Sequence, residues 1–217
     1  METPPQAPGQ SPGIFTALIF IPDISGFTKF VNETELAHSQ MIISKLLEVI
    51  LESNEMGLAI SEIEGDAVLF YKLGDAPSLS DIARQSKTMF LQFHHYLQAM
   101  NRERECDCGA CAQISHLTLK LIVHFGKVTT ITIRNFMKLL GADVILAHRL
   151  LKNNVPGNEY TLLSEHYLQT QKNRDPGEVI DWDEIKEGSI DYEHIGTVNY
   201  KYVSLTPLLK LVPPPVP

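Results

Sequence analysis

The apolar residues of this chain change their spacing from one segment to the next, and the order of those changes limits the possible folds. Residues 14–21 are almost all apolar, which is typical of a strand buried on both faces. In residues 38–53 the apolar side chains recur at steps of three and four, which predicts a helix with one face packed inward. The same spacing returns in residues 79–100, so strands and helices alternate along the chain.

The remaining segments complete a mixed pattern. Further strands are predicted over 58–63, 67–72, 117–124, 127–133, 160–163 and 200–205, and a third helix over 139–152. Glu64 and Gly65 are expected to join the first pair of these strands, and Gly126 the second, because glycine accepts the positive φ of a tight hairpin. This order predicts an α+β fold, a ferredoxin-like antiparallel sheet with flanking helices.

Proline marks both ends of the chain. Four prolines among small and polar residues predict a flexible tail over residues 1–13. Residues 208–217 end in Pro-Pro-Pro-Val-Pro and are expected to form a second, proline-rich tail. Between them we expect one domain over 14–207, with a polar, cysteine-containing insert at 102–116.

Charge and hydropathy exclude several classes of protein. The net charge of -8 and the pI near 5.4 argue against a broad surface for nucleic acid or anionic membrane. The longest uninterrupted apolar stretch, residues 17–21, is far shorter than the roughly 20 residues of a membrane helix, and no secretory leader pattern opens the chain. We therefore expect a cytoplasmic protein that binds neither nucleic acid nor membrane.

Two aspartates stand where a strand ends or begins. Asp23 follows the first buried strand, and the turn Ile24-Ser25-Gly26-Phe27-Thr28 then opens a short helix whose free amide groups suit phosphate. Asp66 follows a glycine at the start of another strand. If the two strands are neighbours, both carboxylates can hold a hard divalent cation bridged to phosphates. The pair predicts a magnesium nucleotide site, although either aspartate alone is as readily a helix cap or a turn residue.

Four blocks, in order along the chain, resemble the class III adenylate and guanylate cyclases. They are Phe20–Thr28, Glu64–Ala67, His124–Val128 with the form His-x-Gly-x-Val, and Gly141–Leu150 with the form Gly-x-x-Val-x-x-Ala-x-Arg-Leu. The whole chain looks closest to a bacterial family of cyclase-like proteins catalogued only as a domain of unknown function. The resemblance implies the class III nucleotidyl cyclase fold and conversion of a nucleoside triphosphate to a 3′,5′-cyclic nucleotide.

The resemblance also implies a head-to-tail homodimer with the site at the seam between subunits. Asp23 and Asp66 correspond to the aspartates that hold two Mg²⁺ or Mn²⁺ ions, and the carbonyl of Ile24 assists. Arg149 corresponds to the arginine that steadies the triphosphate from the second subunit. The ions would lower the pKa of the ribose 3′-hydroxyl and offset charge during an in-line attack that expels pyrophosphate.

Several positions depart from the cyclase pattern. Ile145 replaces the asparagine that orients the ribose, and Ile195 replaces a phosphate-binding lysine, for which Lys201 is an alternative. Glu62 resembles the base-selecting residue of guanylate cyclases, but Lys138 at the partner position fits neither cyclase class. Lys138 either reads a carbonyl of another base or pairs with Glu62 across the seam. These changes leave a second hypothesis, a catalytically degenerate nucleotide-binding or dimerisation module in signalling.

A short cysteine-rich segment offers a second type of metal site. Its candidate ligands for a structural zinc ion are Cys106, Cys108, Cys111 and His116. His94 and His95 are alternative fourth ligands, and three reduced thiols without metal are the competing interpretation. Two other histidines are expected to lie outside the site. His124 is on a strand, where structural histidines are common, and His148 should point about 100° away from Arg149 on a helix.

Overall fold

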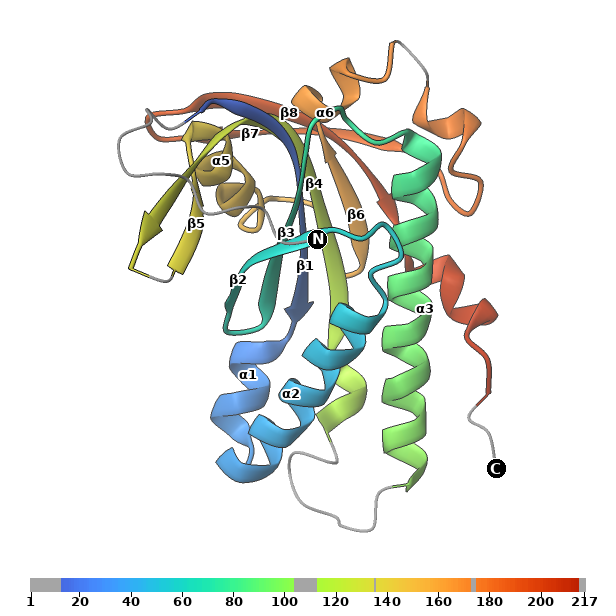
Figure 1. Cartoon of the computed structure of the whole chain (residues 1–217). Coiled ribbons are helices and arrows are strands. Elements are labelled where there is room, and N and C mark those ends of the chain that lie inside the picture. The colour runs from blue at the N-terminus through green and yellow to red at the C-terminus, as the bar shows by residue number, and fades with distance from the viewer. Residues whose placement is uncertain (1–12, 104–112, 135, 173–174, 215–217) are drawn as a thin grey trace.

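The structure is a computed structural model that describes residues 13–103, 113–134, 136–172 and 175–214 (Figure 1). Its strands are β1 (Phe15–Ser25), β2 (Ala59–Glu64), β3 (Ala67–Leu73), β4 (Thr118–Ile133), β5 (Phe136–Leu140), β6 (Tyr160–Ser164), β7 (Lys186–Tyr192) and β8 (Gly196–Ser204). Its helices are α1 (Phe27–Glu33), α2 (Leu36–Glu52), α3 (Leu79–Glu103), α5 (Ala142–Leu150) and α6 (Glu165–Gln169), with the 3₁₀ helices η1 (Ile114–His116), η2 (Pro176–Glu178) and η3 (Thr206–Leu211). None of the described helices is long and apolar enough to cross a membrane.

The strands form one sheet in the order β2-β3-β1-β4-β6-β8-β7, and β5 pairs with the distal part of β4. The described strand pairs are antiparallel apart from β4 with β6, which run parallel. β1 is central and pairs with β4 along its whole length, from Phe15 opposite Val128 to Ser25 opposite Thr118. The α+β fold with flanking helices that the sequence predicts is confirmed, with one parallel strand pair within the sheet.

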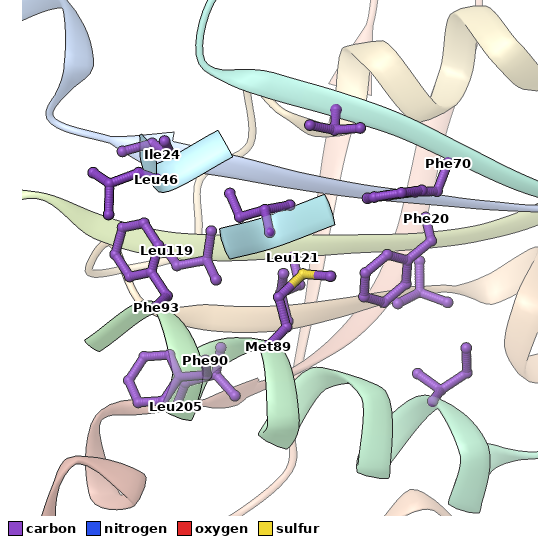
Figure 2. Close-up of a cluster of buried hydrophobic side chains, with 14 of the residues drawn as sticks. Phe20, Ile24, Leu46, Phe70, Met89, Phe90, Phe93, Leu119, Leu121 and Leu205 are labelled. Atoms are coloured by element: carbon purple, nitrogen blue, oxygen red, sulfur yellow. The ribbon is translucent and has the colours of Figure 1, made fainter. Parts of the chain in front are cut away.

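Two hydrophobic clusters cover the two faces of the sheet. On the face covered by α2 and α3, Phe20 and Phe70 of the sheet belong to the same cluster as Met89, Phe90 and Phe93 of α3 (Figure 2). All five side chains are completely buried, and burial of such a side chain contributes about 1.5–3 kcal/mol to stability. α5 covers the other face with Val144, Leu146, Ala147 and Leu150.

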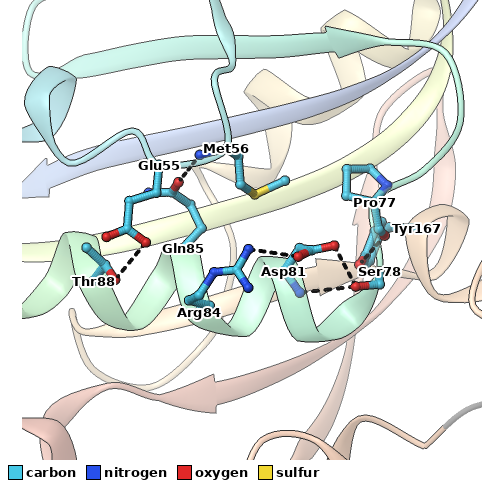
Figure 3. Close-up of polar contacts among 9 residues, drawn as sticks. All are labelled: Glu55, Met56, Pro77, Ser78, Asp81, Arg84, Gln85, Thr88 and Tyr167. Atoms are coloured by element: carbon cyan, nitrogen blue, oxygen red, sulfur yellow. Dashed lines mark hydrogen bonds and ion pairs between the residues drawn. The ribbon is translucent and has the colours of Figure 1, made fainter.

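Buried polar contacts fix α3 to the loops around it (Figure 3). Gln85 is fully buried, its Nε2 donates to the carbonyl of Ser53 at 2.7 Å, and its Oε1 accepts from the Met56 amide at 3.0 Å. The Tyr167 hydroxyl of α6 donates to the carbonyl of Pro77 at 3.0 Å. Because buried amide and carbonyl groups are costly when unpaired, these contacts specify how the loops before β2 and α3 pass over the core.

The predicted hairpin at Gly126 is wrong. The two predicted strands are one continuous strand, β4, in which Gly126 lies opposite Ala17 of β1. Glycine is required there for a different reason, since an added Cβ would lie 2.1 Å from Cγ of Asp143 on α5. The absence of a side chain at Gly126 therefore lets α5 approach the sheet.

The turn instead follows Ile133, where the chain reverses from β4 into β5. Residues 136–140, which include the start of the helix predicted over 139–152, form strand β5. Gly141 has a φ of 147° and is followed by α5, which begins at Ala142. The apolar residues of this segment fit either element, and the glycine marks the boundary between them.

The residues after 207 that the structure describes pack against the rest of the protein. Leu208 of η3 is completely buried in the cluster that α3 covers. Nδ1 of His95 on α3 lies 3.0 Å from the carbonyl oxygen of Pro213. Trp182 joins the same cluster, and its Nε1 donates to the carbonyl of Ser204 at 3.0 Å.

Candidate functional site

The end of β1 and the β2–β3 turn bring two aspartates to the same edge of the sheet. Asp23 lies opposite Ala67 in the antiparallel pair of β1 and β3. The Ile24 amide donates to the carbonyl of Asp66 at 3.0 Å, which fixes the turn against the end of β1. Gly65 has a φ of 62°, as the predicted turn requires. The two predicted metal ligands are therefore neighbours.

The chain leaves β1 through a turn that only glycine accommodates easily. Gly26 has a φ of 91°, and an added Cβ would lie 3.1 Å from the carbonyl oxygen of His116. α1 begins at the next residue, so the amides of its first turn have no partner within the helix. Ser25, Phe27 and Thr28 accordingly border the pocket that opens beside Asp23.

The electrostatics of the two aspartates favour a cation. Burial raises the pKa of Asp23 above its ordinary value, and the Lys120 ammonium opposes this rise. Burial also raises the pKa of Asp66 to about 6, and the neighbouring Asp23 carboxylate adds to the rise. A carboxylate whose pKa is raised by burial and by like charge is stabilised when a cation binds beside it.

Lys120 is part of the site, although the sequence analysis did not single it out. It lies opposite Asp23 in the β1–β4 pair, and its Nζ is 3.2 Å from Oδ1 of Asp23. The same ammonium donates to the carbonyl of Leu151 at 3.1 Å. Only 18% of the Lys120 side chain and 13% of the Asp23 side chain are exposed, so solvent screens this ion pair weakly. A lysine within the otherwise apolar segment 119–123 was the signal in the sequence.

These residues line a pocket of about 880 Å³. Nine of the predicted site residues lie on its wall, namely Asp23, Ile24, Ser25, Gly26, Phe27, Thr28, Asp66, Ile145 and Arg149. The residues that the sequence analysis did not assign to it are Lys29, Glu64, Lys120, His148, Leu151, Lys152 and Asn158. The expectation that His148 lies outside the site is wrong: Ile145 and His148 are three residues apart, on one face of α5.

Glu62 and Lys138 form an ion pair within one chain, at 2.6 Å between Oε2 and Nζ. The pair links β2 to β5, so the predicted contact between these two residues exists without a second subunit. Nε2 of His148 lies 3.6 Å from the other oxygen of Glu62. Glu62 also borders a smaller hollow of about 130 Å³ that Asp23 and Asp66 line as well. Glu62, one of the two predicted base-selecting residues, thus borders the same hollow as the two predicted metal ligands.

The other predicted cations and metal ligands are placed elsewhere. Lys201, considered as a substitute for a phosphate-binding lysine, pairs with Glu187 at 3.1 Å and borders other hollows of the surface. Nε2 of His94 lies 2.8 Å from Oε1 of Glu159, a residue far from the cysteine-rich segment in the sequence. Cys106, Cys108 and Cys111 lie outside the described residues, and His116 is exposed in η1. The zinc site stays a prediction.

Comparisons with known proteins place the chain in a family. Residues 43–160, more than half of the chain, match the model described as "Protein of unknown function (DUF2652)". The chain belongs to this family. The DUF2652 chain is 31% identical over 127 residues to "Uncharacterized protein Rv2561/Rv2562" of Mycobacterium tuberculosis (strain ATCC 25618 / H37Rv). The aligned region is 58% of this chain and 59% of that protein, so the chain spans less than two thirds of its relative.

Solved structures confirm the predicted likeness to class III cyclases. The adenylyl cyclase CyaB from P. aeruginosa superposes with a TM-score of 0.59 and 18% identity, over 90% of this chain and 97% of that one. The guanylyl cyclase Cya2 gives 0.61 and 17%, over 89% and 94%. A bacterial light-regulated adenylyl cyclase gives 0.61 and 13%, over 94% of this chain and 57% of that one. At these identities the shared property is the fold of the cyclase catalytic domain.

Proposed function

We propose that this DUF2652 chain binds a divalent-metal nucleoside triphosphate and, as a head-to-tail homodimer, cyclises it to a 3′,5′-cyclic nucleotide. The observation that carries the proposal is the convergence of Asp23 and Asp66 on a pocket whose wall also contains Arg149. The carboxylates complement the metal ions and the guanidinium complements the phosphates. The class III cyclase fold of the chain supports the same reaction class.

The ligands present fit Mg²⁺ or Mn²⁺. The carboxylates of Asp23 and Asp66 and the carbonyl of Ile24 are hard oxygen donors, which both ions prefer. When bound, the ions would lower the pKa of the ribose 3′-hydroxyl and offset the charge of the phosphates. Arg149 is exposed on the pocket wall of the same chain, whereas the resemblance implies an arginine from the second subunit. In either place it would hold the triphosphate through charge-assisted hydrogen bonds. The first amides of α1 would contribute further donors to phosphate oxygens.

An exposed apolar surface supports dimerisation. Large apolar side chains that are 40–60% exposed gather on β2, the distal half of β4, β5 and the start of α5, at Ile60, Ile63, Ile131, Ile133, Met137, Leu140 and Ile145. β2 and β5 are in contact, and the Leu139 amide of β5 donates to the Ser61 hydroxyl of β2 at 3.4 Å. Ile131, Ile133 and Leu140 lie on one face of the β4–β5 ribbon, and exposed apolar surface of this kind is typical of protein interfaces. We propose that a second copy of the chain covers it.

A specific observation favours a second candidate, a nucleotide-binding module without turnover. Ile145 is 58% exposed on the pocket wall, at the position where the cyclase pattern has a ribose-orienting asparagine. Loss of one transition-state hydrogen bond costs about 1–3 kcal/mol. The Glu62–Lys138 pair in addition engages both proposed base-selecting residues with each other.

The deciding experiment is incubation of the purified chain with ATP or GTP and Mn²⁺, followed by mass spectrometry of the products and parallel nucleotide-binding titrations. We expect a 3′,5′-cyclic product that forms at wild-type level in Lys210→Met, a distant surface control, and is lost in Asp23→Asn. Metal-dependent binding without product would instead support the binding module. A chain that neither binds nor converts either nucleotide would refute both and leave a dimerisation scaffold.

Lys120 is expected to compete with metal for the two carboxylates. In Lys120→Met the ammonium at 3.2 Å from Asp23 is removed, so two acids with raised pKa lose their neighbouring cation. We expect the metal-free variant to melt at a lower temperature at neutral pH. We also expect it to bind Mn²⁺ alone more tightly, by up to about tenfold, because a like charge has left the site.

Calorimetric titration with Mn²⁺ alone, and then with Mn²⁺ and nucleotide, separates the two roles that Lys120 can have. Lys152→Met is the matched control, because Lys152 lines the same pocket and no ion pair with Asp23 is described for it. Weaker binding of Mn²⁺ alone in Lys120→Met would contradict the competition and make Lys120 a positioning residue for Asp23. Tighter Mn²⁺ binding with weaker nucleotide binding would mean that the released ammonium contacts phosphate.

A further inference from the structure

A second cluster of metal-ligating side chains lies beneath the N-terminal end of α5. It consists of His124 on β4, Asp143 in the first turn of α5 and His166 in α6. One ligand atom from each residue lies within 4.8 Å of the other two. Nε2 of His124 and Oδ1 of Asp143 are 3.0 Å apart, and the rings of the two histidines meet edge to face with centroids 5.2 Å apart.

The cluster is held in place by contacts that leave its ligand atoms facing one another. His124 is completely buried, and its Nδ1 is 2.9 Å from Oγ of Ser164. The second oxygen of the Asp143 carboxylate accepts from the Lys127 amide at 2.7 Å. Gly126 has no side chain, and a Cβ there would overlap Asp143. Such outer contacts orient the ligands of protein metal sites.

We propose that His124, Asp143 and His166 form a binding site for a transition-metal ion of the zinc class. Two imidazoles and one carboxylate form a ligand set that zinc takes in proteins. Zinc at about 2.0–2.1 Å from tetrahedral ligands places the ligand atoms about 3.3 Å apart, close to the distance already present between His124 and Asp143. His166 is exposed, so its side chain can turn to close the third ligand position.

Metal binding at this site would move the single proton of the neutral His124 ring. In the metal-free network a ring that donates from Nε2 to Asp143 accepts at Nδ1 from Oγ of Ser164. When Nε2 binds the ion, the ring proton is on Nδ1 and donates to Oγ of Ser164, which fixes the ring. Burial lowers the pKa of His124, which keeps the ring in the neutral form that binds metals.

The site is separate from the pocket of Asp23 and Asp66. His124 lies opposite Ile19 in β1, whereas Lys120 lies opposite Asp23, four residues and roughly 13 Å away along the strand. An ion held by β4, α5 and α6 would tie both helices to the sheet. Because α5 also carries Arg149, the ion would restrain the helix that lines the nucleotide pocket, whatever reaction occurs there.

The test is a zinc and cobalt titration of the 217-residue chain after a chelator has removed all metal. Cys106, Cys108 and Cys111 are replaced with serine in every sample, so that the cysteine-rich segment cannot contribute. We expect one equivalent to bind, with a cobalt spectrum of tetrahedral type that has no thiolate charge-transfer band, and to raise the melting temperature. His166→Asn should weaken this binding at least tenfold, because it removes one of the three ligands. Since His166 is exposed, its replacement leaves the core intact.

His194→Asn is the matched control, because it makes the same chemical change at a site away from the cluster. The side chain of His194 is 88% exposed on the β7–β8 turn. It should bind zinc as the parent does. Asp66→Asn should also leave this binding unchanged, which separates the site from the nucleotide pocket. The proposal is overturned if the cysteine-free chain shows no saturable zinc binding, or if His166→Asn binds zinc as tightly as its parent.

Discussion

Replacing Asp66 with asparagine is expected to abolish metal-dependent nucleotide binding while making the metal-free protein more stable at neutral pH. Removal of one of two carboxylate ligands should weaken binding by about 100-fold or more, equivalent to about 2.7 kcal/mol. The gain in stability follows because burial and the Asp23 carboxylate raise the pKa of Asp66 to about 6, so its charged form destabilises the native state at neutral pH. Opposite effects on binding and stability distinguish a lost ligand from a damaged fold.

The pH dependence has a definite sign. The folded pKa of Asp66 is about 6 and its ordinary value is 3.8, so between these values the native state binds more protons than the unfolded chain. The contribution of Asp66 to the free energy of unfolding therefore falls as the pH rises from about 4 to about 6, and Asp66→Asn should lack this fall. Metal competes with the same proton, so Mn²⁺ affinity of the wild type should rise as the pH increases through about 6.

Thermal melting in chelator across this pH range, and Mn²⁺ titration at each pH, would measure both effects. Asp75→Asn is the control, because Asp75 is an exposed acid outside the pocket and should change neither quantity. An Asp66→Asn protein that binds metal and nucleotide as the wild type does would show that the two aspartates are not the metal ligands. A variant that is less stable at neutral pH would contradict the electrostatic account of Asp66.

The sequence predicted those elements whose apolar spacing is set by burial. β1, β3, α2 and α3 were located to within a few residues because each packs an apolar face, or two, into the core. β7 was not predicted, since its sequence Lys-Glu-Gly-Ser-Ile-Asp-Tyr is mostly polar and it lies at the edge of the sheet. Such a strand is specified by its partner β8 rather than by its own pattern.

The residues of the candidate site likewise differ in whether the sequence could predict them. Asp23, Asp66 and Arg149 lie in motifs with recognisable local spacing, so the sequence could point to each of them. Lys120 enters the site only because β4 pairs with β1 in the register that sets it opposite Asp23. His148 was excluded by its angle from Arg149 alone, whereas the pocket wall spans Ile145 as well. Strand register and the breadth of a pocket wall arise from tertiary structure, and local patterns do not contain them.

Replacing Gly126 with alanine is expected to lower the free energy of unfolding by about 3 kcal/mol, because the new methyl group cannot coexist with Asp143 in its present position. The added Cβ would lie 2.1 Å from Cγ and 2.5 Å from Cβ of Asp143. Asp143 must therefore move, and it would lose its contacts to Nε2 of His124 at 3.0 Å and to the Lys127 amide at 2.7 Å. Both groups would then lose the carboxylate as their partner.

A double-mutant cycle in urea with chelator present tests this cause directly. Asp143→Ala alone should cost about 1–3 kcal/mol through the unpaired His124 and Lys127 groups. In Gly126→Ala with Asp143→Ala the two Cβ atoms would still lie 2.5 Å apart, so part of the clash remains. The contacts to His124 and Lys127 are already lost in the Asp143→Ala background, however, so the double variant should be more stable than the sum of the single effects by about 1–2 kcal/mol. Gly177→Ala is the control with a small expected effect, since its Cβ would meet nothing closer than 3.6 Å. Additive effects would show that Gly126 is required by the β1–β4 pairing itself rather than by the approach of α5.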